Sequence, residues 1–599
     1  MLIAVSLAAP GVEAQQSQAT HAMTWEEAGL KFSDLQHYFN TPACEHRPRA
    51  MLGCLFAIES LLTGLNPPMQ IGFDVGAIAR IVEHHRHNPD GRRHPGAVKL
   101  GSEVMPHNFK GPLRLEPASE NTLLAHRASP QAGESHKAFY QSRNAAIVAR
   151  LDELSRHTAS RAAITWQTLI ASALDMHLSA NRVESHAEFA ANLINLQLRI
   201  GKTPHDQIST DGMAFGRKRE SSGFYGLGFV MQIHEDDSLH ISRVNKGGPA
   251  HRSGVKSGDR IVSIDGWKWD EDASPIGQRV EKAMTYFLRN EPVAASLQIA
   301  RGGDTLSFEV PRMHVENLRL AHEVLRRHDR AFLYLGLSRF PSAGSVCPLF
   351  AQIVREHPDT DGWILDLRRN AGGNLNTVTC LTGILLEPGQ IIFYEEEAGG
   401  ELTPRAHTPG ARNDPRAELS GDERPPTSAV QVEPLAVQKP LVVLLDYRSA
   451  SGSELMAAAL QDYGRAWIVG ERSFGKGTEQ IGAASASNPH IWSWRDIKTF
   501  YRPAKSTIQL NGVQPDFEVF PDPAATEITA ERIREEDMFF NPVVAANNPP
   551  WRNPRLDEIE RIGRCAGGLA GNAIARWRDD ATIDFQLETA LDVAACAVE

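Results

Sequence analysis

A serine stands where a short apolar strand is predicted to turn into a helix. Ser451 follows the run LVVLLD at 441–446 and precedes a helix rich in Ala, Leu and Met that extends to Tyr463. At such a turn the free backbone amides of the helix N-terminus can stabilise an oxyanion, and Gly452 permits close approach of the backbone. Ser451 and Glu454 also match the capping box S-x-x-E, so this segment alone predicts a helix cap at least as well as a nucleophile.

A lysine and a glycine turn could complete the chemistry that the serine begins. Lys476 lies in the sequence FGKG, and a lysine between two glycines is unusual for a merely solvated surface. Upstream, LDLRRNAGG ends a predicted strand in the turn Gly372-Gly373, whose amides could supply a second oxyanion donor. The candidate oxyanion donors are therefore Gly452, Gly372 and Gly373.

A separate glycine-rich pattern predicts a peptide-binding module. The sequence YGLGFV at 225–230 precedes GGPAHRSGVKSGDRIVSIDG at 247–266, and together they resemble a PDZ domain over residues 222–312. In such a loop backbone N–H groups can hold a terminal carboxylate, and the next strand offers its edge to an extended peptide. The loop residues concerned are Gly226, Leu227, Gly228 and Phe229. Each glycine could instead serve an ordinary turn, and the two apolar residues could pack in the domain core.

The order of these motifs resembles that of a protease family. LDLRRNAGG, SASGSELMAAALQDYGRAWIVGERSFGKGTEQ and GVQPD, placed after a PDZ-like domain, are similar to the carboxyl-terminal processing proteases, also called tail-specific proteases. The resemblance implies that Ser451 is the nucleophile, that Lys476 is its base, 25 residues later, and that Gln480 supports the base. Asp462 matches a position described in the family as important, in a supporting, structural role. The resemblance also implies a ClpP/crotonase-like core of strands and helices.

The residue types define how such a site would cut a peptide bond. A serine hydroxyl needs a base, but a lysine with its ordinary pKa near 10.4 is neutral only about 0.1% of the time near pH 7.4. Burial must therefore lower the pKa of Lys476, because desolvation disfavours the ammonium form. Lys476 would take the proton of Ser451 and pass it to the leaving amine, while Gln480 orients Lys476 by a hydrogen bond. This chemistry requires no metal ion and no other cofactor.

The spacing of apolar residues predicts a multidomain α/β protein. Segment 1–22 reads as a signal-peptide-like stretch, and residues 23–202 and 540–599 have helical patterns. A polar, glycine-containing stretch at 203–222 predicts a linker. Residues 316–535 alternate between helix and strand patterns, which predicts the protease core.

The expected elements of that core follow one another closely. They are helix 318–327, strand 331–337, helix 346–356, strand 362–367, helix 375–386, strand 441–445, helix 453–463 and strand 466–469. Two segments depart from the family pattern: a long loop at 397–438 and the stretch SASNPHIWSWRDIK at 485–498. We expect both to affect substrate access more than chemistry.

Composition narrows the classes of protein. With 599 residues and 65.9 kDa, the chain has room for roughly four domains. A net charge of −11 argues against a general nucleic-acid binder, and no stretch approaches the roughly 20 apolar residues of a membrane-spanning helix. A histidine-rich stretch reads as a solvated loop, because no cysteine or carboxylate pair completes a metal site. Its histidines are His84, His85, His87 and His94.

The chain start and the cysteines indicate an exported protein, most consistent with the bacterial periplasm. Residues 2–9 form a short apolar run like the core of a secretory signal, although the basic residues that usually precede it are missing. Six cysteines allow fifteen pairings, and only pairing of neighbours keeps each bridge within one predicted domain. The pairs would be Cys44–Cys54, Cys347–Cys380 and Cys565–Cys596. Buried free thiols are the alternative.

Three functions fit these observations. The leading hypothesis is a serine endopeptidase with a Ser/Lys dyad that binds C-terminal tails of protein substrates through its PDZ domain. The second is a catalytically inactive PDZ scaffold or adaptor on a protease fold, against which the intact Ser451, Lys476 and Gln480 speak. The third is a tricorn-like peptidase that uses a histidine, which the FGKG lysine disfavours. The helical flanks could dock an adaptor protein.

Overall fold

A computed structural model describes much of the chain between residues 24 and 598. The described residues are 24–31, 48–63, 69–71, 115–118, 131, 134–135, 137–146, 149, 177, 185–201, 203–210, 225–233, 237–245, 248–274, 276–289, 291–314, 320–341, 343–397, 401–406, 435, 439–485, 488–521, 532–538, 551–579 and 584–598. The signal-peptide-like segment 1–22 lies outside them, as do the four clustered histidines and most of the loop 397–438.

A six-stranded sheet forms the centre of the larger α/β unit. In spatial order its strands are β12 (Leu320–Arg327), β13 (Arg330–Leu337), β14 (Gly362–Asp366), β17 (Leu441–Leu445), β18 (Trp467–Gly470) and β21 (Phe517–Glu518). The strands from β13 to β21 are parallel, and β12 is antiparallel to β13. Every residue of β14 and β17 is buried, as expected for parallel strands covered on both faces. The predicted α/β fold class is confirmed.

The prediction of a helix at 318–327 is wrong, because this segment forms the edge strand β12. It pairs with β13 along its whole length, from Leu320 opposite Leu337 to Arg327 opposite Arg330. The two residues between the strands, His328 and Asp329, have φ of 48° and 59°. Two positive φ values in a two-residue connection are typical of a tight hairpin turn. The turn and the cross-strand pairing therefore outweigh the helical preference of the local sequence.

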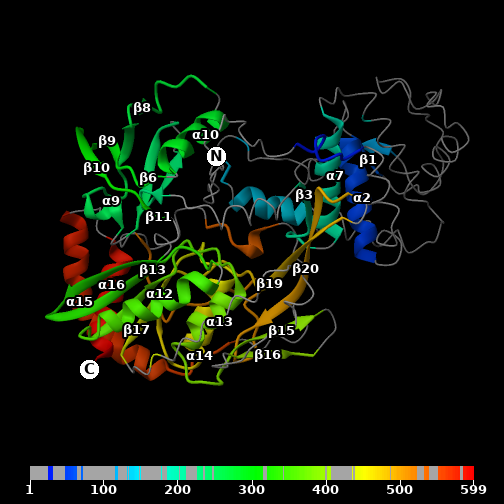
Figure 1. The fold of residues 1–599 in the computed structure, drawn as a ribbon. Coiled ribbons are helices and arrows are strands. Elements are labelled where there is room, and N and C mark those ends of the chain that lie inside the picture. Colours follow the sequence, from blue (N-terminus) through cyan, green and yellow to red (C-terminus); the bar gives the residue numbers. More distant parts are fainter. Residues whose placement is uncertain are drawn as a thin grey trace, which may run out of the picture.

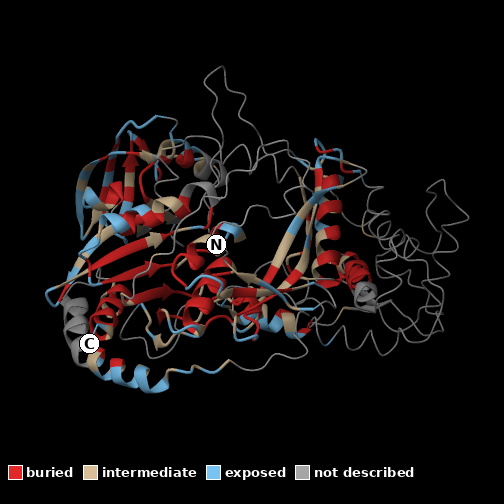
Figure 2. Cartoon of the chain, turned by 60° about the horizontal axis from the view of Figure 1, so that its bottom comes forward, coloured by how far each residue is buried: buried red, intermediate tan, exposed pale blue. Residues whose placement is uncertain are grey.

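Helices cover both faces of this sheet (Figure 1). On one face lie α12 (Ala343–Glu356), α13 (Leu375–Gly383) and α14 (Gly452–Asp462), and on the other lie α15 (Leu556–Asp579) and α16 (Phe585–Ala597). Neighbouring strand residues serve opposite faces: Val443 joins the cluster of the first three helices, whereas Val442 and Leu444 join the cluster of α16. Figure 2 shows both clusters as buried layers beside the sheet. The C-terminal helices thus complete the core of the α/β unit.

Disulfides fasten the helices on each face. Cys347–Cys380 joins α12 to α13, and Cys565–Cys596 joins α15 to α16. Both are pairs predicted from sequence, and Cys54 is also disulfide-bonded, although its predicted partner lies outside the described residues.

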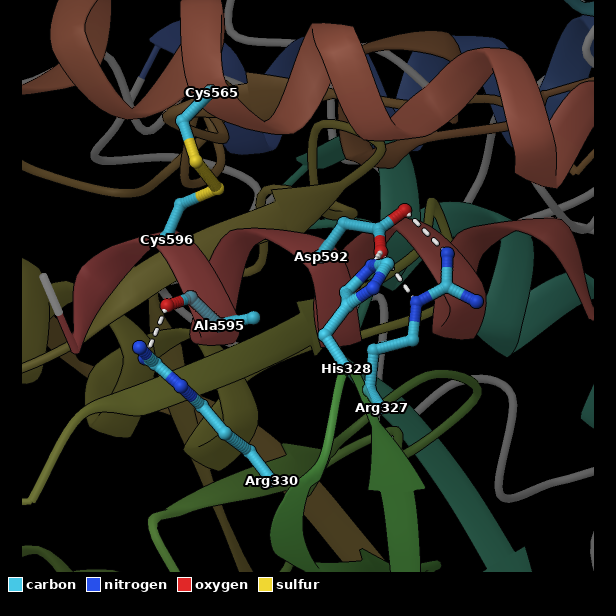
Figure 3. The surroundings of a disulfide bond; sticks show 7 residues. All are labelled: Arg327, His328, Arg330, Cys565, Asp592, Ala595 and Cys596. Atoms are coloured by element: carbon cyan, nitrogen blue, oxygen red, sulfur yellow. Dashed lines mark hydrogen bonds and ion pairs between the residues drawn. A yellow bond between two sulfur atoms is a disulfide. The ribbon is translucent and has the colours of Figure 1, made fainter.

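Ion pairs also hold α16 against the sheet (Figure 3). The Arg327 guanidinium on β12 donates to both carboxylate oxygens of Asp592 (2.5 and 2.7 Å). From the start of β13, Arg330 Nη1 donates to the Ala595 carbonyl (2.7 Å). The hairpin of β12 and β13 therefore binds α16 through the buried Asp592 carboxylate and through a backbone carbonyl.

The PDZ-like unit is built around its own sheet. Its strands, in spatial order, are β10 (Asp304–Val310), β9 (Ala295–Arg301), β7 (Arg260–Ile264), β6 (Leu239–Val244) and β5 (Phe229–Ile233), with β8 (Trp267–Lys268) beside β7. Helix α10 (Ile276–Phe287) packs against β5, where the rings of Phe287 and Phe229 meet edge to face at 5.5 Å. β5 is an edge strand, so one row of its backbone groups faces away from the sheet.

A second sheet connects the core to the N-terminal region. Its spatial order is β16 (Thr403–Ala406), β15 (Ile391–Glu397), β20 (Ile491–Tyr501) and β19 (Thr478–Ala484), and β3 (Gln207–Thr210) pairs with β20. Figure 1 shows β20 reaching from the core to the N-terminal helices. The predicted linker is thus wrong for 207–210, because these residues form a strand, and residues 211–222 lie outside the description.

The N-terminal region combines helices with a small strand pair. α2 (Pro48–Thr63) crosses α7 (His186–Gly201) so closely that a Cβ added to Gly53 would lie 2.6 Å from the backbone of Gly201. The short strands β1 (Met69–Ile71) and β2 (Leu115–Pro117) pair antiparallel, in a region for which no strand was predicted. Across the described residues, no helix is both long enough and apolar enough to span a bilayer.

Candidate active site

Ser451 lies on a sharp turn between a buried strand and a helix. β17 ends in Leu445, and α14 begins at Gly452. The Ser449 hydroxyl stabilises the turn by donating to the Leu367 carbonyl (2.9 Å) and accepting from the Asp446 amide (3.0 Å). Partly exposed Ser451 has φ 54° and ψ −115°, a conformation that is uncommon outside glycine. Backbone strain of this kind is frequent at functional sites.

A buried carboxylate joins the serine turn to the lysine segment. Glu454 forms the predicted capping box with Ser451, and its Oε2 accepts from the Ser451 amide (2.8 Å). It also accepts from the amides of Lys476 (2.9 Å) and Gly475 (2.6 Å) and from the Ser473 hydroxyl (2.5 Å). Burial raises the pKa of Glu454 to about 7, although these four donors act to lower it. The Glu454 carboxylate of the capping box therefore binds the backbone amides of both predicted catalytic residues, Ser451 and Lys476.

The glycines around Lys476 allow its backbone to pass close to neighbouring segments. Gly475 has φ of 97°, and a Cβ added to Gly477 would lie 2.6 Å from the Gln509 nitrogen. Just before them, the amide of Phe474 donates to the Ser449 carbonyl (2.9 Å). The lysine segment consequently runs beside the turn that carries the serine.

The environment of the Lys476 amine changes its acidity. The amine donates to the Thr478 carbonyl (2.9 Å). Burial lowers the pKa of Lys476, which is the direction that a lysine base requires. Four nearby carboxylates oppose this shift: those of Asp496, Glu535, Glu454 and Glu479, in decreasing order of effect.

Gln480 is placed near the lysine but differs from the prediction in its contacts. Its Nε2 donates to the Thr478 hydroxyl (3.3 Å) and to Asp496 Oδ1. Gln480 and Lys476 thus share Thr478, whose hydroxyl and carbonyl serve one side chain each. The predicted direct orientation of Lys476 by Gln480 is replaced here by contacts through Thr478 and Asp496.

Two of the three predicted oxyanion glycines, Gly372 and Gly452, lie against Ser451, and Gly373 follows Gly372 in the same turn. A Cβ added to Gly372, which has φ of 96°, would lie 2.8 Å from both the Gly452 nitrogen and the Ser451 Cβ. The Gly452 N–H is the first amide of α14, which a helix cannot satisfy internally. The Gly372 N–H donates to the Asn370 side chain (2.9 Å), so it is already engaged, and Gly373 is the better second candidate.

Asp462 lies at the opposite end of α14 from Ser451. A helix rises about 1.5 Å per residue, so eleven residues separate the two by roughly 15 Å. The Asp462 carboxylate pairs with buried Arg502 (2.6 Å) and accepts from the indole of Trp551 (2.7 Å). These contacts support a structural role for Asp462.

The four predicted tail-binding residues form the loop that leads into β5. Gly226 ends β4 (Tyr225–Gly226), Leu227 is buried in the PDZ core, and Gly228 has φ of 83°. The Leu227 and Gly228 carbonyls accept from the amides of Ala250 (3.0 Å) and Asn245 (2.9 Å). Leu227 therefore packs in the core, and the loop continues directly into the edge strand β5.

Several residues around the lysine were missed by the sequence analysis. The amide of Gly477 donates to Gln509 (2.6 Å), whose side chain donates to Glu535 (3.1 Å), and His205 contacts the same Glu535 oxygen (2.7 Å). Asp496 was also missed, and it lies in the segment noted only as a departure from the family pattern. These residues come from distant segments and match no motif, so only their position could reveal them. Within the described residues, no group of three or more His, Cys, Asp or Glu side chains is placed to hold a metal ion.

Comparison with protein families identifies both units of the chain. A family model described as Peptidase family S41 matches residues 332–519, and one described as PDZ domain matches residues 217–283. The first covers the central sheet except β12 and the start of β13, together with the serine turn and the lysine segment, and the second covers the glycine loop and most of α10.

Similar curated proteins carry protease names. The chain is 28% identical over 334 residues to a carboxy-terminal-processing protease of Bartonella bacilliformis, covering 55% of this chain and 69% of that protein. It is 27% identical to a tail-specific protease of Haemophilus influenzae, with 59% and 48% covered. A Synechocystis carboxyl-terminal-processing protease is 28% identical, with 43% and 53% covered. The chain thus spans about half the length of the last two.

A solved structure is similar at low identity. The photosystem II D1 C-terminal processing protease has 19% sequence identity and a TM-score of 0.34, over 61% of this chain and 89% of that one.

Proposed function

Because the chain carries a peptidase family S41 domain behind a PDZ domain, we propose that it is a serine endopeptidase acting on the C-terminal tails of protein substrates. Ser451 is the nucleophile and Lys476 is its general base in this proposal. The observation that carries it is their common anchor: Glu454 accepts hydrogen bonds from the backbone amides of both residues. This arrangement supports a functional pairing because a helix cap alone would not need the second contact.

The first step of the proposed reaction is attack of Ser451 on the substrate carbonyl. The neutral Lys476 amine takes the hydroxyl proton while the serine oxygen bonds to the carbonyl carbon. Burial of the amine supports this role because it lowers the pKa of Lys476 towards the working pH. The negative charge that develops on the carbonyl oxygen is stabilised by the amides of Gly452 and Gly373.

The second half of the reaction releases the two products. Lys476 donates its new proton to the leaving amine, which departs with the C-terminal fragment. A water molecule then gives a proton to Lys476 and attacks the serine ester, and Ser451 leaves as the restored hydroxyl. No residue from a Ser-His-Asp arrangement takes part in these steps.

Recognition of the tail is assigned to the PDZ domain. Its edge strand β5 and the loop of Gly226 to Phe229 provide backbone groups for an extended peptide and its terminal carboxylate. The disulfides support action in an oxidising compartment outside the cytoplasm, such as the bacterial periplasm. Docking of an adaptor on the helical flanks stays a prediction.

One cleavage assay tests the proposal. The full chain and its variants Ser451→Ala and Lys476→Ala are mixed with a carrier protein that ends in an apolar, disordered tail. We expect each variant to lower kcat/KM by about a thousandfold or more, because the nucleophile or its base is lost. Lys505→Ala, an exposed lysine beside Tyr394, is the matched control and should keep wild-type activity.

The outcomes separate the candidate functions. Equal cleavage by the wild type and both variants would overturn the Ser/Lys assignment. A wild-type chain that binds the tail without cutting it would support the inactive scaffold instead. Replacing the apolar tail by a polar one should abolish cleavage, and unchanged cleavage would contradict recognition of the tail by the PDZ domain.

A further inference from the structure

An acidic residue outside every recognised motif lies directly opposite Gln480. Asp496 is on β20, and the ladder with β19 places it as the cross-strand partner of Gln480. The register shifts between Glu479 and Gln480, so the pairing moves from Lys498 directly to Asp496 and skips Ile497. This bulge brings the Asp496 and Gln480 side chains into hydrogen-bond contact. Bulges often re-aim a side chain beside an active site.

The Asp496 carboxylate uses its two oxygens differently. Oδ1 accepts from Gln480, whereas Oδ2 is buried and has no hydrogen-bond partner among the described residues. A buried carboxylate oxygen without a donor is unfavourable unless a positive charge lies near. Among the charged groups that act on Lys476, Asp496 has the largest effect. The Asp496 carboxylate and the Lys476 amine are therefore electrostatically coupled.

Asp496 also determines which end of the Gln480 carboxamide remains free. The NH₂ group of Gln480 donates to Asp496 and to the Thr478 hydroxyl. An amide has two such donors, so both are occupied and only the carbonyl oxygen is left as an acceptor. A carbonyl acceptor is what an ammonium group formed on Lys476 would need.

The N-terminal region braces this strand residue. The Asp496 amide donates to Asp206 Oδ1 (2.7 Å), and Asp206 is buried. Two residues earlier on β20, the Trp494 indole donates to the Ser209 hydroxyl of β3 (2.7 Å). The part of β20 that carries Asp496 is thus fixed from a segment almost 300 residues away, at 206–209.

We propose that Asp496 is a positioning residue for Lys476, holding the Gln480 carboxamide in one orientation and balancing the ammonium charge that Lys476 gains during the reaction. This inference rests on the proposed function of Lys476 as the base. It assigns to strand β20 a role in the chemistry, whereas the sequence pattern led us to expect an effect mainly on substrate access.

The proposal has a definite consequence for the pH dependence. The groups that act on the Lys476 amine are Asp496 from β20, Glu535 from its short 3₁₀ turn, Glu454 from α14 and Glu479 from β19. Each negative charge favours the ammonium form and so raises the pKa of Lys476. Because only the neutral amine is a base, activity rises with pH through that pKa. Removing the Asp496 charge should therefore move the rising limb to lower pH.

The test compares Asp496→Asn with the wild-type chain across the pH range. The asparagine keeps the shape and an acceptor for Gln480 but loses the charge. We expect the midpoint of kcat/KM against pH to fall by about one unit, together with a lower plateau because the base is weaker. Asp496→Ser removes the same charge in a smaller side chain and serves if the amide variant fails to fold. Glu397→Gln, an exposed carboxylate on neighbouring β15, is the matched control and should leave the midpoint unchanged.

A second readout separates this inference from the proposed function. In the Ser451→Ala background, the rate at which an amine-selective acylating reagent labels Lys476 is followed by mass spectrometry against pH. The labelling midpoint reports the pKa of Lys476 without any proteolysis, and Asp496→Asn should lower it by the same amount. An unchanged midpoint in both readouts would overturn the role of Asp496. A shifted labelling midpoint in a chain that cleaves nothing would retain the coupling and refute the proposed protease activity.

Discussion

The two halves of the candidate site are built in opposite ways. The serine side, comprising residues 446–454 and the turn at Gly372, arises from contiguous strand-turn-helix segments with dense backbone contacts. The lysine side, comprising residues 474–480 with His205, Asp496 and Glu535, is assembled from segments that are far apart in the chain. The nucleophile is therefore placed mainly by backbone contacts between two such segments, and the base mainly by polar side chains from several segments.

This difference indicates which substitutions each side of the site can tolerate. On the serine side a single added methyl group would strike backbone atoms that cannot move. On the lysine side most of the polar contacts have a side chain as one partner, such as Glu454, Gln509 or Asp496. Side chains adjust more easily than backbone, so changes to these side chains should tune the base rather than destroy the site. The following predictions test this contrast, from the largest expected effect to the smallest.

Gly372→Ala should have the largest effect because it acts on the rigid serine side. Its Cβ would lie 2.8 Å from the Gly452 nitrogen and the Ser451 Cβ, at a φ of 96° that alanine rarely adopts. We expect kcat/KM to fall by about a thousandfold, since both the nucleophile and an oxyanion donor are displaced. Gly389→Ala is the control, because its φ of 86° is equally unusual but a Cβ would meet open space. Similar losses in both variants would mean that backbone strain alone is responsible.

Glu454→Gln tests the anchor that both sides share. The folded chain holds a proton on Glu454 between its ordinary pKa of 4.5 and its raised value of about 7, whereas the unfolded chain releases it. The free energy of unfolding should therefore fall as pH rises through this range, by about 3 kcal/mol. Urea unfolding in the Ser451→Ala background, compared near pH 5 and pH 8, should show this dependence in Glu454 chains and its loss in Glu454→Gln. An equal slope in both would exclude Glu454 as its source.

Removing each disulfide in turn compares the face of the sheet that carries the serine side with the opposite face. Replacing Cys347 and Cys380 by serine, or Cys565 and Cys596, should lower the free energy of unfolding by about 2 kcal/mol in each case. Only the first pair should also reduce activity, because Val378 of α13 packs against Gly452 at the start of α14. Thermal denaturation and cleavage rates check both points. Loss of activity in the second pair as well would show that the far helices also position the site.

His205→Ala should have the smallest effect, since it acts through a chain of side chains on the lysine side. His205 contacts Glu535, whose side chain is linked to the Gly477 amide through Gln509. We expect kcat to fall about threefold, which is under 1 kcal/mol, with KM unchanged. His240→Ala in the PDZ domain is the control for the loss of a histidine. A loss as large as that of Gly372→Ala would contradict the contrast between the two sides.

Local patterns predicted the serine side almost completely. An apolar run predicted β17, and a capping box predicted the start of α14. A glycine turn predicted that Gly372 could serve the same site as Ser451, and the two lie close together. The same patterns failed at β12, where a hairpin turn with two positive φ values decided the structure. They also failed at β3, where three of the four residues are polar and the segment becomes a strand by pairing with β20.

The sequence by itself determined the similarity to Peptidase family S41 and to PDZ domains, the fold class and the order of the motifs, because these depend on residue types at fixed spacing along the chain. It also predicted the pairs Cys347–Cys380 and Cys565–Cys596 with free thiols as the alternative, and the structure confirms both bridges. Only the tertiary structure decided the surroundings of Lys476. Burial and the charges of Asp496, Glu535 and Glu454 depend on which distant segments meet, and that information is carried by packing and strand pairing across the whole fold.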